Sequence, residues 1–210
     1  MPVLCLEGPS AVGKTTIAAA LASQRSARVV PEVNVLFERP QDAPPAWYLD
    51  RQAERWTLAT DAARDHRLVL LDGDPFQPLW YNWAYGFAGW QSLDALGAFY
   101  RPRIVRGEMR FPDRYVVFGA SEDALRERKT SDRARRRGGF EAHLRFIGPQ
   151  RRYFEAMETL SPGQVRFLDA RTVEESACAV EALAGDIEAE RHPVALFDGL
   201  IDWLRRHPAA

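Results

Sequence analysis

One stretch near the start of the chain has the residue types and spacing of a phosphate-binding loop. Residues 8–15 fit the pattern G-x-x-x-x-G-K-[ST]. Glycines at 8 and 13 let the backbone curl so that its amides converge on a polyphosphate. Lys14 can reach the terminal phosphates, and the Thr15 hydroxyl is a ligand for Mg²⁺. The residues that we expect to bind the nucleotide here are Gly8, Ser10, Ala11, Val12, Gly13, Lys14, Thr15 and Thr16.

Acidic side chains follow two of the apolar segments that read as buried strands. Glu32 follows the second such segment, and Asp72 and Asp74 follow the third. Because open parallel sheets bind ligands at the carboxyl ends of their strands, these acids are expected beside the phosphate loop. Phosphoryl transfer needs a carboxylate near the metal and usually another that accepts the proton of the acceptor hydroxyl. We assign Asp72 and Thr15 to the metal and Glu32 to the proton, with Asp72 or Asp74 as the alternative base. An ordinary Asp-Gly turn would also explain the Asp72 and Asp74 pair.

Arginines crowd a segment in the second half of the chain, at about residues 129–139. A lid that closes over bound phosphates would bring guanidinium groups to the charge that develops during transfer. A solvated surface is the alternative, because charge runs usually face water. We expect a short Arg-rich lid, with Arg128 as the first candidate for stabilising the transferring group and Arg133 for binding the nucleotide.

Residues 76–90 are unusually rich in aromatic side chains. Most of them are expected in the core, but several tryptophans beside an acidic turn also suggest a flat apolar pocket that stacks on a ring. One or two members of a small group are expected to face the acceptor: Trp80, Tyr81, Trp83 and Tyr85. Trp47 and Trp56 either close the same pocket or pack in the core.

The elements that must position these residues alternate between strands and helices. Strands are predicted at residues 3–6, 27–30, 68–71, 115–118 and 165–168. Helices are predicted over residues 16–22, 46–67, 92–101, 121–128, 140–160, 173–190 and 194–206. This alternation favours an α/β fold in three layers, with a parallel sheet of about five strands covered by helices on both faces. A length of 210 residues suits a single domain over residues 1–210.

Composition limits the function only weakly. A net charge of −1 gives no reason to expect nucleic acid or an anionic membrane surface as a partner. No apolar run approaches about 18 residues, so we expect neither a transmembrane segment nor a signal peptide. Cys5 and Cys178 are both expected to be buried and unpaired, which fits a cytoplasmic protein. Whether the chain forms a homodimer is left open.

Taken together, these residues resemble the P-loop kinases that act on small molecules. The resemblance is to the thymidylate kinase and deoxynucleoside kinase group and to bacterial relatives that phosphorylate nucleoside-like or antibiotic hydroxyls. Residues 6–16 are similar to their first strand and phosphate loop, and Glu32 stands where deoxynucleoside kinases carry a general-base Glu. Residues 72–74 stand where those kinases have Glu-Arg-Ser and thymidylate kinases have Asp-Arg-Tyr. Similarity to the fourth strand, the helix before the lid and the last strand, whose following loop cradles adenine, covers residues 112–118, 121–128 and 168–170.

The resemblance implies an ATP- and Mg²⁺-dependent phosphotransferase whose acceptor is a hydroxyl of a small ring-containing molecule, a nucleoside or an antibiotic-like alcohol. Both kinase families carry an Arg beside the acid at residues 72–74 to grip a phosphate, and this chain does not. A neutral acceptor is therefore favoured over a nucleoside monophosphate. A nucleoside monophosphate kinase is the first alternative, and an NTP-driven regulatory ATPase or switch is the second. A guanine-nucleotide switch is disfavoured, because Lys occurs only at positions 14 and 129 and no Asn-Lys-x-Asp motif exists.

Overall fold

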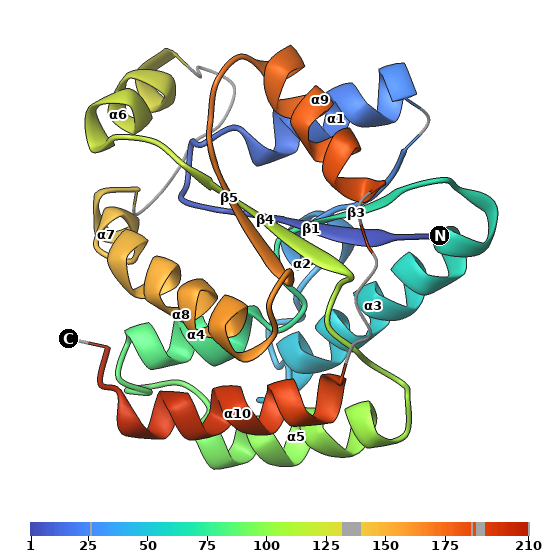
Figure 1. Ribbon diagram of the computed structural model, residues 1–210. Helices are drawn as coiled ribbons and strands as arrows, with labels where there is room; N and C mark the ends of the chain where they lie inside the picture. The colour runs from blue at the N-terminus through green and yellow to red at the C-terminus, as the bar shows by residue number, and fades with distance from the viewer. Residues whose placement is uncertain (26, 132–139, 186, 188–191, 210) are drawn as a thin grey trace.

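The fold is built on a five-stranded sheet in which all neighbouring strands are parallel (Figure 1). The computed structural model describes residues 1–25, 27–131, 140–185, 187 and 192–209. The strand order is β2-β3-β1-β4-β5. The strands are β1 (Val3–Glu7), β2 (Arg28–Val30), β3 (Val69–Asp72), β4 (Arg114–Gly119) and β5 (Val165–Asp169). The five-stranded parallel sheet predicted from the sequence is therefore confirmed.

Helices cover both faces of the sheet, as the alternating pattern predicts. In Figure 1, α1 and α9 lie on one side of the strands, and α3, α4, α5, α8 and α10 lie on the other. The longer helices are α1 (Lys14–Arg25), α3 (Trp47–Asp65), α5 (Leu93–Val105), α6 (Glu122–Ser131), α8 (Ile147–Leu160), α9 (Val173–Ala184) and α10 (Pro193–Arg206). The shorter helices are α2 (Val33–Leu36), α4 (Gln77–Ala84) and α7 (Phe140–Leu144).

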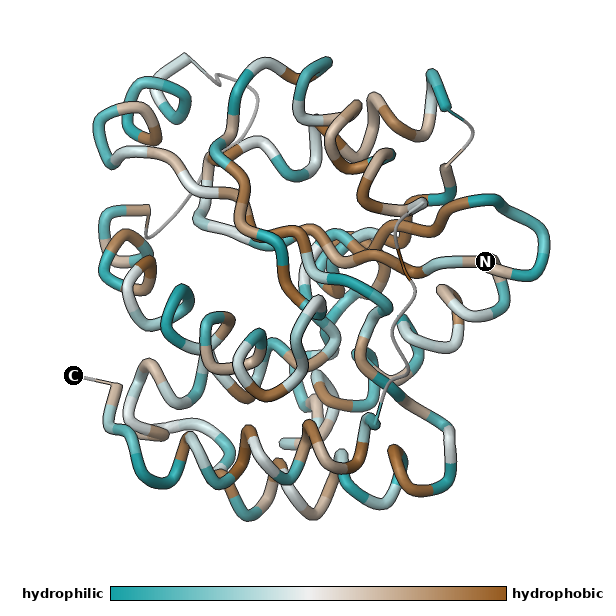
Figure 2. Tube along the Cα trace, viewed as in Figure 1, coloured by the Kyte–Doolittle hydropathy of each residue, from teal (hydrophilic) through white to brown (hydrophobic). Residues whose placement is uncertain are grey.

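The strand β1 shows why the chain forms a sheet buried on both faces. All five of its residues are buried. Leu4 and Leu6 point into the core beneath α1 and α9, whereas Val3 and Cys5 point into the larger core on the opposite face. This is the two-residue periodicity of a strand with helices on both sides. Figure 2 shows the same result as a hydrophobic band along the central strands, with hydrophilic residues on the outer helices.

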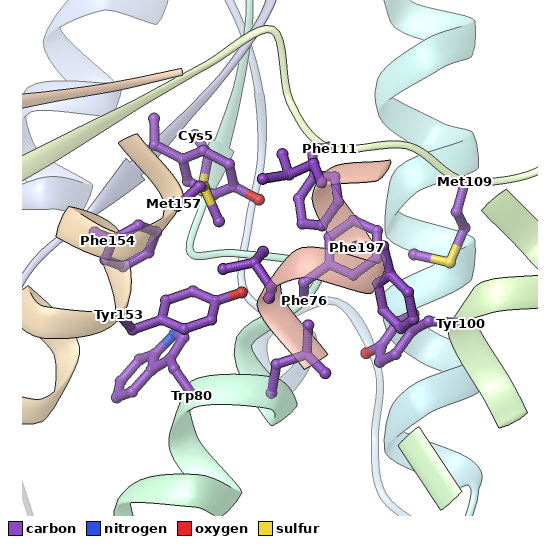
Figure 3. Close-up of a cluster of buried hydrophobic side chains, with 14 of the residues drawn as sticks. Cys5, Phe76, Trp80, Tyr100, Met109, Phe111, Tyr153, Phe154, Met157 and Phe197 are labelled. Atoms are coloured by element: carbon purple, nitrogen blue, oxygen red, sulfur yellow. The ribbon is translucent and has the colours of Figure 1, made fainter. Parts of the chain in front are cut away.

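The larger core is rich in aromatic side chains, and it includes part of the aromatic segment. Figure 3 shows Phe76, Trp80 and Tyr153 in this core with residues from β1, α5 and α10. Phe76 stacks on Phe111, with ring centroids 4.3 Å apart. These side chains pack α4 and α8 against the sheet.

Several predicted boundaries are wrong, and the reasons are local. The helix predicted over residues 140–160 is two helices, α7 and α8, because the Pro149 ring would clash with the carbonyl of Arg145 in a continuous helix. The short helices α2 and α4 were not predicted, since neither is long enough to show a helical period. The helix α6 extends through Ser131, into the segment predicted as a lid, and residues 132–139 of that segment lie outside the described residues.

The expectation that both cysteines are buried is correct for Cys5 and wrong for Cys178. The buried residues of α9 are Ser176, Ala177 and Val180, so Cys178 falls on the exposed side of the helix. Its sulfur lies 3.1 Å from Nη2 of Arg25 on α1. Within the described residues, no helix combines the length and the apolar character that crossing a bilayer requires.

Candidate active site

The phosphate loop joins β1 to α1 in the predicted place. Gly8 has φ +133° and Gly13 has φ +109°, both in the region that L side chains rarely adopt. A Cβ at Gly8 would collide with the carbonyl oxygen of Phe118 on β4, so this position also needs glycine for space. The Lys14 ammonium donates a hydrogen bond to the Gly8 carbonyl at 2.7 Å and so lies within the curl of the loop.

The strand order brings the predicted metal-binding pair into contact. Because β3 lies beside β1, the end of β3 is next to the start of the loop, with Leu6 in register with Asp72. The Thr15 hydroxyl donates a hydrogen bond to Oδ2 of Asp72 at 2.7 Å. Oδ1 of Asp72 is buried and has no hydrogen-bond partner among the described residues.

These oxygens fit a magnesium site of the kind found beside nucleotide phosphates. Mg²⁺ prefers hard oxygen ligands, and such sites usually contribute only one or two protein side chains, the rest being phosphates and water. Within the described part of the chain, no group of three or more His, Cys, Asp or Glu residues could hold a metal on its own. The hydroxyl of Thr15 and the unpartnered oxygen of Asp72 therefore fit a metal that is bound together with nucleotide phosphates.

Two further acids are buried behind the loop. Oε1 of Glu7 accepts a hydrogen bond from the Asp74 amide at 2.7 Å, and Oε2 accepts one from the side-chain amide of Gln150 at 2.8 Å. Oδ1 of Asp74 accepts hydrogen bonds from the Tyr115 hydroxyl at 2.8 Å and the Phe76 amide at 2.9 Å. Burial raises the pKa of Glu7 above its usual range. Burial, followed by the charge of Glu7, raises the pKa of Asp74 to about 8.

Asp74 and Glu32, two of the candidate proton acceptors, differ in their exposure to solvent. Asp74 is 1% exposed and anchors the turn after β3 to β4. Glu32 is exposed and occupies the N-cap position of α2, where its side chain makes no capping hydrogen bond. Its side chain lies over the same turn, because a Cβ built on Gly73 would be 3.7 Å from Cγ and 3.9 Å from Oε1 of Glu32. Of the three predicted acids, Glu32 is therefore the exposed one, and it lies over the turn that follows Asp72.

Arg128 lies against the phosphate loop. Its Nη1 donates to the Val12 carbonyl at 2.9 Å and its Nη2 to the Ala170 carbonyl at 3.0 Å. It thus links the loop to the segment that follows β5. Arg133 lies outside the described residues.

The aromatic residues divide into core and rim. Trp83 is 2% exposed, packs against Trp203 and donates to the His207 carbonyl at 2.6 Å, so it belongs to the core beneath α10. Trp80 is also buried, and its Nε1 has no hydrogen-bond partner among the described residues. Trp56 is buried in the same large core, whereas Trp47 is only partly buried.

Tyr81 and Tyr85 are half-buried and contact each other, Trp90 and Phe146.

Sequence reasoning missed two buried charged residues of this site. Glu7 ends β1 directly before the loop, so the rule that singled out Asp72 would also have found it. Arg55 on α3 is 1% exposed and donates to the carbonyls of Asp72 at 2.9 Å and Gly73 at 3.1 Å. The signal for Arg55 was its position inside the buried stripe of α3, beside the buried Trp56.

Solved structures with this fold include nucleoside and nucleotide kinases. A deoxyadenosine kinase from M. mycoides with bound dATP superposes with a TM-score of 0.57, at 14% identity, over 89% of this chain and 100% of that one. A thymidylate kinase from Candida albicans superposes with a TM-score of 0.53, at 13% identity, over 88% of this chain and 91% of that one. No protein-family model matches the sequence, and no curated protein matches it. The chain therefore has the P-loop α/β fold seen in deoxynucleoside and thymidylate kinases.

Proposed function

We propose that this protein is a P-loop kinase that transfers the γ-phosphoryl group of ATP to a hydroxyl of a small, neutral, ring-containing molecule, such as a nucleoside. The observation that carries the proposal is the 2.7 Å hydrogen bond between Thr15 and Asp72 at the phosphate loop. Glu32 lies beside the same turn. The fold shared with solved deoxynucleoside and thymidylate kinases supports the same conclusion.

The loop residues would hold and polarise the donor. Mg²⁺, when bound with ATP, would neutralise charge on the β- and γ-phosphates. Thr15 and Asp72 are the side chains that would hold it. Lys14 would exchange its hydrogen bonds to the carbonyls of Gly8 and Pro9 for the terminal phosphates. Arg128 would stabilise the negative charge on the transferring phosphoryl group after its guanidinium is released from the carbonyl of Val12.

Glu32 would accept the proton of the acceptor hydroxyl. It is exposed at the carboxyl end of β2, next to the metal-binding pair. Asp74 is poorly suited to this role, because burial raises its pKa to about 8 and its Oδ1 is already engaged by two donors. Asp72 is engaged by Thr15. A carboxylate that is open to the acceptor is what general-base catalysis requires.

A neutral acceptor agrees with the charges around the turn after β3. The only guanidinium bound to this turn among the described residues is that of Arg55, which is buried and directed at carbonyl oxygens. Tyr81, Tyr85 and Trp90 offer partly open rings on which a planar acceptor could stack.

One observation favours the nucleoside monophosphate as an alternative acceptor. Arg145 is exposed, and its guanidinium lies 5.3 Å from the ring centre of Tyr85 and 4.9 Å from that of Phe146. An exposed cation against the same aromatic group would suit an acceptor that carries a phosphate. The two acceptor classes therefore have to be compared directly.

A transfer assay with labelled ATP and Mg²⁺ tests the proposal. The acceptors are nucleosides, nucleoside monophosphates and hydroxyl-bearing antibiotics, with a control that lacks acceptor. Label on a neutral alcohol is the expected result. Label on monophosphates alone would replace the proposal with the alternative above. Phosphate release that needs no acceptor, and that a protein partner enhances, would instead indicate a regulatory ATPase.

A further inference from the structure

A buried arginine of α3 joins the ends of two strands. Nε of Arg55 donates to the Pro31 carbonyl at 2.7 Å, directly before Glu32. Nη2 donates to the carbonyls of Asp72 at 2.9 Å and Gly73 at 3.1 Å. One guanidinium thus binds the backbone that carries the proposed base and the backbone that carries the proposed metal ligand.

The guanidinium itself is held in a fixed orientation. Nη1 of Arg55 donates to Oε1 of Gln52 at 2.6 Å, one turn earlier on the same helix. Gln52 and Trp56 on this face of α3 are buried, so the helix is anchored at this point. A planar fork with several fixed donors can reach two strand ends at once, which the single ammonium of a lysine cannot do.

The free energy of folding alone does not explain why a cation is buried at this place. All four acceptors of Arg55 are uncharged oxygens, and no carboxylate of a described residue is hydrogen-bonded to it. Burying an arginine without such a partner carries a desolvation cost that hydrogen bonds offset only in part. The geometry of its contacts gives a more specific reason, because they meet at the two backbone segments that carry Glu32 and Asp72.

We propose that Arg55 is a positioning residue that sets the distance between Glu32 and Asp72. This inference rests on the proposed kinase function. Arg55 does not touch the nucleotide or the acceptor. It holds the turn after β2 against the turn after β3, so that the carboxylate that takes the proton and the carboxylate that holds the metal keep one separation.

The first test compares Arg55→Lys with Arg51→Lys. Arg51 lies on the same helix but pairs with Glu54 at 2.7 Å and touches neither strand end. Arg55→Lys should lower kcat by about 100-fold, the effect of a displacement of about 1 Å in a catalytic group. KM for ATP should rise no more than several-fold, since the phosphate loop is intact and only the metal ligand is displaced. Arg51→Lys should behave as the unchanged protein. Equal kcat in Arg55→Lys and the unchanged protein would overturn the inference.

A double-mutant cycle separates positioning from a general loss of structure. If Arg55 acts by placing Glu32, Arg55→Lys should cost little further activity in a Glu32→Gln background. Effects that multiply independently would contradict the inference. Gln52→Met keeps the buried arginine but loosens it, and it should show a smaller fall in kcat with the same dependence on Glu32. This variant covers the case in which Arg55→Lys does not fold.

A binding measurement does not depend on turnover. Mn²⁺ affinity in the presence of a non-hydrolysable ATP analogue, followed by electron paramagnetic resonance, should fall several-fold in Arg55→Lys, because the Asp72 backbone is no longer held. Unchanged Mn²⁺ affinity would overturn the inference. If the unchanged protein binds Mn²⁺ and nucleotide but transfers phosphate to no acceptor, the kinase proposal fails while the role of Arg55 in the metal site is still decided.

Discussion

Lys14 is the residue whose role follows most directly from the chemistry of its position. Its ammonium lies within the loop, 2.7 Å from the Gly8 carbonyl, where it can turn to a bound phosphate. Lys14→Ala should lower the rate of phosphoryl transfer by about 10³-fold or more while the fold is retained. The rate is measured by the transfer assay and the fold by thermal unfolding. Arg64→Ala, which removes an exposed cation from the end of α3, is the control and should be active. A merely modest loss in Lys14→Ala would refute the assigned role.

The raised pKa of Asp74 predicts that the stability of the fold depends on pH. Burial raises its pKa to about 8 in the folded protein, against about 4 in the unfolded chain. Between these values the folded state binds the extra proton, so this group stabilises the fold at low pH and loses that contribution as pH rises toward 8. Asp74→Asn keeps an oxygen for the hydroxyl of Tyr115 and does not titrate.

The Tm of the unchanged protein should therefore fall more steeply from pH 5 to pH 8.5 than that of Asp74→Asn. At about 1.4 kcal/mol per pKa unit, the three units between pH 5 and pH 8 correspond to about 4 kcal/mol, or about 10 °C in Tm. Calorimetry at several pH values measures it. Parallel Tm curves for the two proteins would show that Asp74 is ionised in the fold across this range.

At the scale of elements, the contact between the phosphate loop and β4 decides which glycine can be replaced. Gly8→Ala would place a Cβ against the Phe118 carbonyl in a backbone region with φ +133°. It should destabilise the fold by about 3 kcal/mol, from strain and overpacking together. Gly97→Ala is the matched control, because Gly97 lies inside α5 with nothing within 4 Å of its Cβ position. It should stabilise the fold by about 1 kcal/mol. Urea unfolding of both variants measures the difference, and equal stabilities would contradict the close approach.

The elements also show what the sequence could predict. All five strands were predicted within one or two residues, because each is a short apolar run that ends at a turn signal. The break between α7 and α8 was missed although Pro149 marks it, since the apolar pattern continues across it. The short helix α4 was missed because its aromatic residues pack on the sheet and on α8 rather than repeat along a long helix.

For the whole molecule, the strand order rather than any local pattern assembles the site. The rule that ligands bind at the carboxyl edge of a parallel sheet was enough to bring Thr15, Asp72 and Glu32 together. It could not reveal Arg55 or the burial of Asp74. Both depend on which helix covers the turn after β3, and that is decided by packing between elements far apart in the sequence. Residue spacing can place Arg55 in the buried stripe of α3, but it carries no information about which turn that stripe contacts.

Binding of the nucleotide and the metal should stabilise the entire fold. If ATP and Mg²⁺ bind together at the Thr15 and Asp72 pair, ligand at 100 times its Kd should stabilise the protein by about 2.7 kcal/mol, or roughly 5 to 10 °C in Tm. Most of this shift should disappear with EDTA or in Asp72→Asn, since ATP without the metal leaves its phosphate charge uncompensated.

Asp198→Asn is the control for that measurement. Asp198 is an exposed acid on α10 that pairs with Arg101 at 2.8 Å, and its variant should keep the full shift in Tm. A shift that survives EDTA in the unchanged protein would place the metal outside the binding step. A shift of normal size in Asp72→Asn would show that another group holds the metal. If the shifts in Tm agree with these expectations, β3 contributes to the core through its apolar residues and to the nucleotide site through Asp72. Ligand binding and folding then depend on the same part of the sheet.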